Sequence, residues 1–163
     1  MRKKIFIWAL MIFVMMCSSA WADVLIDEEH FHDDTFRTYV ISKFDKDHDG
    51  VLNNSEIEQA KVIDLYDKSR RYRTWYVKSL KGIEYLTALE SLSCGRYNGL
   101  TEIDVSKNTA LKYLSCSENR ITSLNLNNNR ALETLYCENN LLTSLNVSST
   151  SLKYLYCSHT GIS

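Results

Sequence analysis

The second half of the chain repeats itself, and this feature constrains the fold more than any other. A six-residue segment with leucine first and fourth and cysteine sixth occurs four times, starting at Leu89, Leu111, Leu132 and Leu152. One such unit has an apolar side that it cannot bury alone, whereas stacked units bury it continuously. The sequence therefore predicts a solenoid of stacked coils over residues 62–163.

An asparagine recurs at a fixed distance from the repeated cysteines. Asn119 and Asn140 each follow a cysteine by three residues; Asn98, displaced by one extra residue, and Thr160 take this place in the first and last copies. An amide at a repeated turn can satisfy backbone groups of two adjacent coils. We therefore interpret these positions as structural and not as catalytic.

The complete pattern, L-x-x-L-x-C-x-x-N-x-L, is that of leucine-rich repeats with cysteine at one apolar position. We predict an α/β-type solenoid, in which leucine-rich-repeat coils with short parallel strands follow an N-terminal helix-loop-helix cap. The segment from Val62 to Leu65 is expected to begin the first strand. Roughly three or more repeats are needed for a stable stack, and the chain offers nearly four.

The cysteines share the period of the repeat, being 22, 21 and 20 residues apart. This spacing places Cys94, Cys116, Cys137 and Cys157 in one inward column. Neighbouring strands are close enough for disulfides, but side chains that point the same way would need strained torsions. A straight column also cannot surround a tetrahedral zinc ion. We expect four buried free thiols that act as small apolar residues.

Residues 45–56 match the twelve-residue calcium loop of EF-hands, with aspartate at positions 1, 3 and 5, glycine at 6 and glutamate at 12. A hard cation needs several oxygen ligands, and crowded carboxylates repel one another without it. The cofactor predicted here is calcium. The expected ligands are Asp45, Asp47, Asp49, the carbonyl of Val51, Asn53 through water, and both oxygens of Glu56.

Apolar residues with helical spacing flank this loop: Phe36, Tyr39, Val40 and Phe44 precede it, and Ile57 and Ala60 follow it. EF-hands usually occur in pairs, whereas this chain has one. We expect the first coil of the stack to replace the missing partner, so that calcium stabilises a cap, residues 23–61, on the solenoid. The alternative is a loop that folds without metal.

The N-terminus has the features of a cleaved secretory signal peptide over residues 1–22. Arg2, Lys3 and Lys4 precede an apolar run from Ile5 to Met16, and an A-x-A site ends at Ala22. The run is shorter than the ~20 residues of a spanning helix. We therefore predict export to the periplasm, the cell surface or the medium, with no membrane span after cleavage.

Charge argues against nucleic acid as a partner. Residues 23–163 carry 16 basic and 20 acidic side chains, so no strong cationic field remains after cleavage. The sequence also contains no serine, cysteine or carboxylate constellation that indicates an enzyme. We predict a non-enzymatic binding module.

Together these motifs resemble secreted bacterial leucine-rich-repeat proteins that carry L-x-x-L-x-C-x-x-N repeats and an N-terminal EF-hand-like segment. The resemblance covers about residues 31–163 and includes Lys81 to Leu86, which is similar to the family's entry into its first full repeat. It implies a surface or secreted binding protein without a catalytic centre in the repeats. Such proteins are usually longer.

The concave strand face is the predicted ligand-binding surface, because alternate residues of each strand point out of the stack. The candidate residues there are Tyr113, Tyr136, Tyr154 and Tyr156. Tyrosine suits a protein or a glycan partner, although it is also simply a good strand former.

Self-association through an uncapped last coil is expected too. Alternative functions are a structural spacer or assembly unit, and an accessory domain of a longer surface protein.

Two further segments are less specific. Residues 30–34, His-Phe-His-Asp-Asp, could bind a transition metal, but we interpret them as a solvated linker. The basic aromatic stretch at residues 68–76 is interpreted as a hairpin insertion near the cap.

Overall fold

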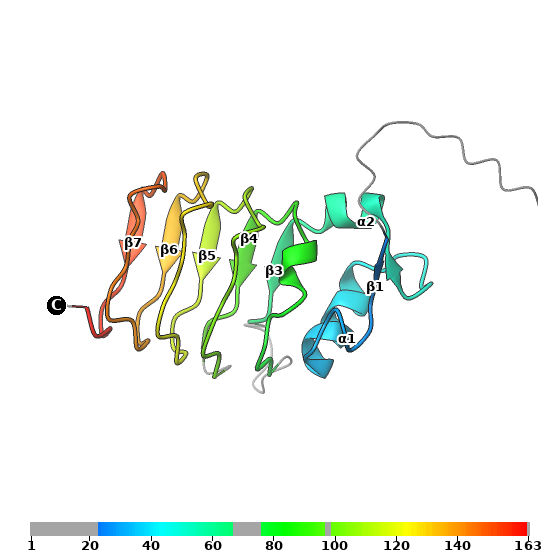
Figure 1. Ribbon diagram of the computed structural model, residues 1–163, viewed down its shortest axis with the longest axis horizontal. Coiled ribbons are helices and arrows are strands. Elements are labelled where there is room, and N and C mark those ends of the chain that lie inside the picture. Colours follow the sequence, from blue (N-terminus) through cyan, green and yellow to red (C-terminus); the bar gives the residue numbers. More distant parts are fainter. Residues whose placement is uncertain (1–22, 67–75, 97–98, 163) are drawn as a thin grey trace, which may run out of the picture.

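The solenoid is built around one parallel sheet of five short strands. The computed structural model describes residues 23–66, 76–96 and 99–162. The strands are β3 (Val62–Asp64), β4 (Ser91–Ser93), β5 (Tyr113–Ser115), β6 (Thr134–Tyr136) and β7 (Tyr154–Tyr156), and they pair in this order. Figure 1 shows them side by side along the molecule, with the cap at one end and the C-terminus at the other. The predicted leucine-rich-repeat solenoid is confirmed.

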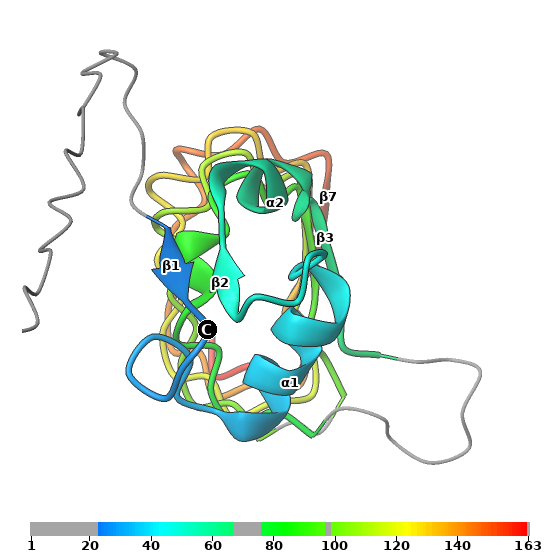
Figure 2. The ribbon, with the colours of Figure 1, turned by 90° about the vertical axis from the view of Figure 1, so that its right-hand side faces the viewer.

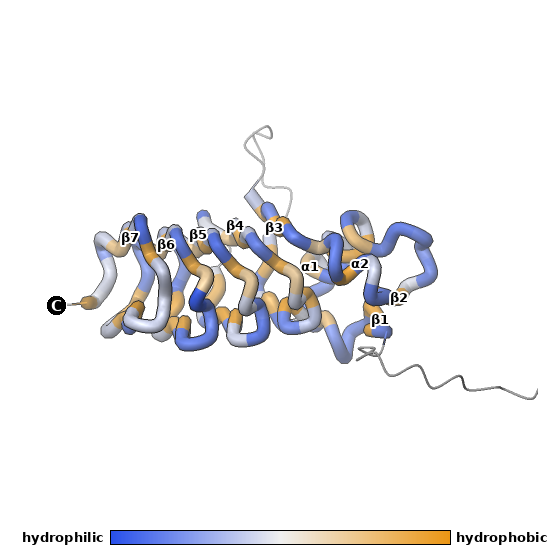
Figure 3. Tube along the Cα trace, turned by 90° about the horizontal axis from the view of Figure 1, so that it is seen from above, coloured by the Kyte–Doolittle hydropathy of each residue, from blue (hydrophilic) through white to orange (hydrophobic). Residues whose placement is uncertain are grey.

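The repeat sets the register of the sheet. The second leucine of each copy aligns with its counterpart on the next strand, from Ile63 through Leu92, Leu114 and Leu135 to Leu155. The first four are fully buried, whereas Leu155 on the last coil is 42% exposed. Viewed from above, the coils lie as parallel ribs in which hydrophobic and hydrophilic stretches alternate (Figure 3).

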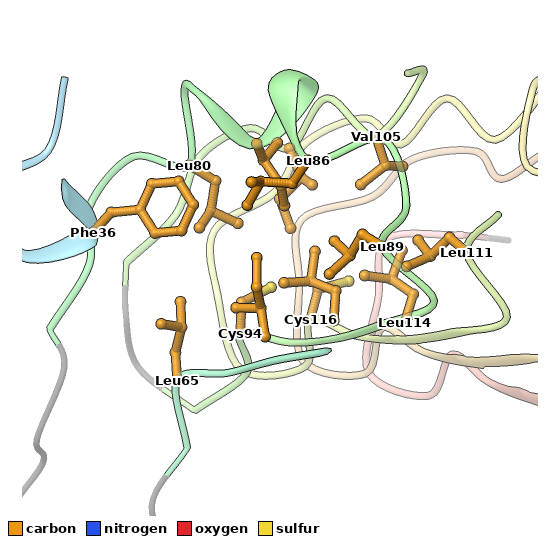
Figure 4. Close-up of a cluster of buried hydrophobic side chains, with 14 of the residues drawn as sticks. Phe36, Leu65, Leu80, Leu86, Leu89, Cys94, Val105, Leu111, Leu114 and Cys116 are labelled. Carbon is orange, nitrogen blue, oxygen red and sulfur yellow. The ribbon is translucent and has the colours of Figure 1, made fainter. Parts of the chain in front are cut away.

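A single apolar core runs through the stack and continues into the cap. Cys94 and Cys116 lie among leucines such as Leu89 and Leu111, and all four are fully buried (Figure 4). From the cap side, Phe36 belongs to the same core. The cysteines therefore fill the apolar role that their period predicted.

Asparagine side chains connect successive coils. The Asn119 amide donates to the carbonyls of Cys94 and Cys116, while its oxygen accepts the backbone N–H of Leu100. Asn140 makes the equivalent bonds one coil later. Thr160 donates only to the carbonyl of Cys157. The structural interpretation of these positions agrees with the geometry; Asn98 lies outside the described residues.

A second asparagine column, which the sequence analysis did not predict, also connects successive coils. Asn108 donates to the carbonyls of Ile83 and Leu86, and Asn129 to those of Val105 and Asn108. Both side chains are fully buried. Their spacing of 21 residues equals the repeat period and was the signal that could have found them.

The cap contains the two helices expected around the cation loop. Helix α1 (Asp34–Lys43) begins after Asp33, whose carboxylate accepts the N–H of Phe36, and it buries Phe36, Tyr39 and Val40. Helix α2 (Asn54–Gln59) begins after Asn53 in a capping box completed by Glu56. Seen along the stack, the cap lies across the end of the coils (Figure 2).

A short N-terminal strand pairs with the cation loop. Strand β1 (Val24–Leu25) is antiparallel to β2 (Val51–Leu52), which lies within the loop sequence, and the N–H of Ile26 donates to the carbonyl of Gly50 at 2.9 Å. The loop strand is therefore paired by the start of the cap itself. Helix α1 contacts the first coil, since the Tyr39 hydroxyl accepts the N–H of Asp64 on β3; that this coil takes the place of a second EF-hand stays a prediction.

Residues 30–34 form part of the cap's packing, so the linker interpretation is wrong. Phe31 is fully buried because its ring packs against Phe36 and Tyr85. A Cβ on Gly82 would come within 2.3 Å of the Phe31 ring, and Gly82 has φ +105°, so only glycine fits there. The α1 side chain of Tyr39 also accepts the N–H of Asp64, at 3.0 Å.

Four coils turn in the same unusual backbone conformation after their strands. Arg96, Glu118, Asn139 and His159 stand two residues after the repeated cysteines and have φ of 65°, 59°, 52° and 52°. Helices are otherwise sparse in the described solenoid, where a single 3-10 turn, η1 (Ile83–Tyr85), precedes the first cysteine repeat.

Among the described residues, no helix has the length and apolar character needed to cross a membrane. The predicted signal peptide and most of the basic aromatic stretch lie outside the described residues.

Candidate functional site

The outer side of the sheet, which we call the strand face, carries the residues that alternate with the buried leucines. On β4 it presents small side chains, Ser91 and Ser93. Strand β5 carries Tyr113 and Ser115, and the other three predicted tyrosines, Tyr136, Tyr154 and Tyr156, lie on β6 and β7. Side-chain size therefore increases along the sheet, away from the cap.

The structure brings three of these tyrosines into ring contact. Tyr136 and Tyr156 stack with their ring centroids 4.5 Å apart and their planes 1° from parallel. Tyr113 meets Tyr136 at a tilt, with centroids 5.8 Å apart. Tyr154 joins no ring contact described for this cluster, and it is the most exposed of the four at 59%. Desolvation, followed by the neighbouring Tyr156 and Tyr113, raises the pKa of Tyr136.

A recess of about 460 Å³ lies on the strand face beside this cluster. Small residues of β4 and β5 and of the turns that follow, such as Ser93, Gly95 and Ser115, line it. Tyr66 and Arg96 bound it toward the cap, while Tyr113 and Tyr136 bound it on the other side. Small side chains beside aromatic ones thus leave a hollow on this face of the sheet.

Among the residues that the structure describes, carboxylates outnumber cations around this recess. Asp64, Glu118 and Glu138 line it, together with one described basic residue, Arg96. The Arg96 guanidinium lies over the Tyr66 ring, 4.5 Å from its centroid, and donates to the Tyr66 hydroxyl at 2.8 Å. The recess therefore has an excess of negative charge.

A column of alternating charges runs beside the strand face. Its members occupy the position just before each strand: Lys61, Glu90, Lys112, Glu133 and Lys153. Glu90 pairs with Lys112 at 2.5 Å and with Lys61 at 3.4 Å, and Lys153 pairs with Glu133 at 3.0 Å. Hydrogen bonds from Lys112 and then Lys61 lower the pKa of Glu90. Sequence reasoning missed this column, although the alternation is visible once the repeats are aligned.

The repeated cysteines are free thiols, and three of them are fully buried. Cys94, Cys116 and Cys137 are fully buried, and Cys157 is partly buried. Burial raises the pKa of Cys94 and of Cys137 to about 12, and it raises that of Cys116 well above its usual value. Because the thiolate is the nucleophile, these side chains are inert.

The cation loop gathers three of its predicted ligands. One carboxylate oxygen from each of Asp45, Asp47 and Asp49 lies within 4.8 Å of the others. Asp45 is buried and accepts the N–H groups of Asp49 and Gly50, whereas the other two aspartates are exposed. Desolvation, followed by repulsion from Asp49, Glu56 and Asp45, raises the pKa of Asp47. This is the crowding that a bound cation relieves.

The remaining predicted ligands lie in the same loop. Glu56 is buried, and its two oxygens accept the N–H groups of Lys46 at 2.6 Å and Asn53 at 3.0 Å. Val51 lies on β2, where its backbone is held by the pairing with β1. The hard oxygen donors of this set fit calcium or magnesium better than a thiophilic metal.

Known proteins are similar to this chain in structure. No protein-family model and no curated protein matches the sequence. A solved structure of the functional domain of InlJ from Listeria monocytogenes, described as including a cysteine ladder, is 30% identical, with a TM-score of 0.72. The crystal structure of an internalin, InlF, from the same species is 23% identical, with a TM-score of 0.64.

These similarities cover most of this chain but less than half of the proteins compared. The InlJ match covers 86% of this chain and 30% of the other, and the InlF match covers 85% and 46%. Both support the leucine-rich-repeat fold, and both come from a bacterium.

Proposed function

We propose that this protein is a non-enzymatic binding module that recognises another protein through the strand face. The observation that carries this proposal is the tyrosine cluster, in which Tyr113, Tyr136 and Tyr156 contact one another at an exposed surface beside a recess. Tyrosine is enriched at protein interfaces because it combines a large apolar area with a polar tip. The InlJ structure, described as a functional domain, supports the same class of module.

The test is an array of proteins and glycans probed with the purified protein and with the double variant Tyr136→Ser/Tyr156→Ser. We expect capture of protein spots that the double variant weakens at least tenfold, while the melting curve changes little because Tyr156 is exposed and Tyr136 is only half-buried. Tyr76→Ser is the control, since Tyr76 is 45% exposed but lies outside the strand face. Capture that survives the double variant would place the binding site elsewhere, and capture of glycans alone would replace the protein partner by a sugar.

We also propose that calcium occupies the loop and stabilises the cap. The crowded aspartates and the buried Glu56 support this, because each would be costly without a compensating positive charge. Asp45, Asp47, Asp49 and Glu56 would hold the ion, with Val51 and Asn53 completing the oxygen set. On this proposal the ion has a structural role, since helix α1 joins the loop to β3 through Tyr39 and Asp64.

Export through an N-terminal signal peptide is part of the same proposal. It rests on the basic residues, the apolar run and the A-x-A site of residues 1–22. An extracellular site would also supply calcium at the concentrations that such loops need, roughly 10⁻⁴ to 10⁻³ M.

A further inference from the structure

We propose that the recess on the strand face receives a basic side chain, lysine or arginine, from the partner protein. This inference rests on the proposed protein-binding function and narrows the chemistry of the partner. It concerns the recess, which the stacked pair Tyr136 and Tyr156 borders through Tyr136.

The lining of the recess suits a long side chain with an apolar stem. It combines residues with little or no side chain, among them Ser91, Ser93 and Gly95, with the rings of Tyr66 and Tyr113. A lysine or arginine has an apolar stem that can lie against aromatic rings while its head reaches polar groups. Serine hydroxyls of the lining can accept hydrogen bonds from such a head.

Charge complementarity selects a cation. Asp64, Glu118 and Glu138 line the recess, and in the described part of the chain no salt bridge joins them to a basic residue. The Asp64 carboxylate accepts the N–H of Tyr66, and Glu138 accepts the hydroxyl of Ser158. Covering three carboxylates with a neutral partner would cost desolvation free energy that no ion pair offsets. A basic side chain offsets that cost.

The carboxylates are arranged for a side chain and not for a bare metal ion. In the residues that the structure describes, the only acidic or metal-ligating group close enough to hold an ion is the aspartate trio of the cation loop. The recess carboxylates come instead from different coils, Asp64 on β3, Glu118 after β5 and Glu138 after β6. A cation carried on a flexible stem can approach them one or two at a time.

The aromatic wall adds to the preference for a cation. Tyr113 is 36% exposed and borders the recess, and a cation over a tyrosine face is attracted by the ring quadrupole. The protein already shows this contact with its own Arg96 over Tyr66, on the opposite side of the recess.

The experiment uses capped pentapeptides, Gly-Ser-X-Ser-Gly with X as Lys, Arg, Gln or Glu, added to the isotope-labelled protein and followed by backbone amide shifts. We expect the Lys and Arg peptides to move the amides of residues 93–95 and 115–117 saturably below about 10 mM, in the range of weak single-residue binding. The Gln and Glu peptides should leave them in place. High salt should weaken the Lys response, because solvent-accessible charges are screened.

Two matched variants separate the recess from general acidity. Glu118→Gln/Glu138→Gln should weaken Lys binding roughly five- to tenfold, given the modest strength of exposed ion pairs. Glu102→Gln removes an exposed carboxylate outside the recess and should leave it unchanged. Circular dichroism checks that both remain folded.

Several results would overturn the inference. These are equal shifts with the Gln peptide, no saturable shift with Lys or Arg, or shifts at these amides with methyl N-acetylglucosaminide but not with the Lys peptide. If array partners still depend on Tyr136 and Tyr156 while no Lys peptide binds, the strand-face function stands and the basic side chain is wrong. If Lys binds the recess but array capture does not depend on the tyrosines, the tyrosine cluster is wrong as the protein-binding site while the basic side chain stands.

Discussion

At the scale of single residues, burial holds the Cys94 thiol in its protonated form. Cys94 has no exposed surface, and desolvation raises the pKa of its thiol from 9.0 to about 12. Its thiol lies 3.5 Å from the carbonyl of Ser115 on the next coil, to which it donates. The cysteines therefore contribute packing between coils, and their ionisation opposes folding.

This raised pKa predicts a loss of stability at alkaline pH. Between about pH 9 and pH 12 the unfolded chain releases the Cys94 proton while the folded chain retains it, so unfolding becomes more favourable as the pH rises. The contribution of one thiol is about 1.4 kcal/mol per pH unit. Urea unfolding at several pH values should show a shallower decline for Cys94→Ala than for the natural sequence. Tyrosine ionisation is common to both proteins, so parallel declines would contradict the prediction.

Of the two asparagine columns, only one was predicted from the sequence. Asn119 and Asn140 were predicted to be structural because they belong to a motif whose spacing is fixed by the cysteines. Asn108 and Asn129 are also buried, but they lie in the variable part of each coil. The neighbouring residues there are polar, so the sequence alone suggests only a turn. Only the fold shows that both columns donate to carbonyls of the preceding coil.

At the scale of elements, the cap depends on a loop that carries its own excess of negative charge. Millimolar calcium should raise the melting temperature, because a ligand of the folded state contributes RT ln(1 + [L]/Kd), about 1 to 2 kcal/mol at about 5 mM for a loop of extracellular affinity. Glu56→Gln should remove most of this rise. Glutamine can still complete the capping box of α2, so the calcium-free protein should stay folded.

The control for this prediction is Glu58→Gln, which removes an exposed carboxylate from the same helix. Its melting temperature should respond to calcium as the natural sequence does. Differential scanning calorimetry with calcium and with chelator provides the measurement. Equal curves in both conditions would reject calcium as a stabiliser of the cap.

Elements formed by contacts between distant residues were harder to predict than those formed by a local pattern. The two helices and the repeat strands follow from spacing within the sequence. Strand β1 has only two residues, Val24 and Leu25, and exists because it pairs with Val51 and Leu52. The recess likewise arises from residues on different coils, so no local pattern marks it.

At the scale of the whole molecule, the alternating charge column adds a second, polar register to the apolar one. The charges alternate in sign along the stack, at Lys61, Glu90, Lys112, Glu133 and Lys153. Opposite charges therefore meet only when each coil stacks on its native neighbours. Glu90→Lys places three like charges in succession. Exposed ion pairs are individually weak, so we expect a melting temperature lower by roughly 2–5 °C.

Salt and a charge-matched variant test this interpretation. The difference between Glu90→Lys and the natural sequence should shrink in 0.5 M NaCl, roughly where the Debye length falls below 5 Å. Glu102→Lys makes the same change in net charge outside the column and should melt close to the natural protein. A salt-independent loss for Glu90→Lys would point to packing and not to repulsion.

The left-handed turns set stability and recognition against each other. A residue with a Cβ in this conformation costs about 1 kcal/mol relative to glycine, and four coils carry one, with φ between 52° and 65°. Glycine at Arg96 or Glu118 would relax the backbone and also remove a charged side chain that lines the recess. His159 is not among the residues that line it, and asparagine, unlike histidine, adopts this conformation routinely. An engineer seeking a more heat-resistant scaffold would therefore start at His159 and not at Asn139, whereas glycine at Glu118 would stabilise the fold and weaken binding in the recess.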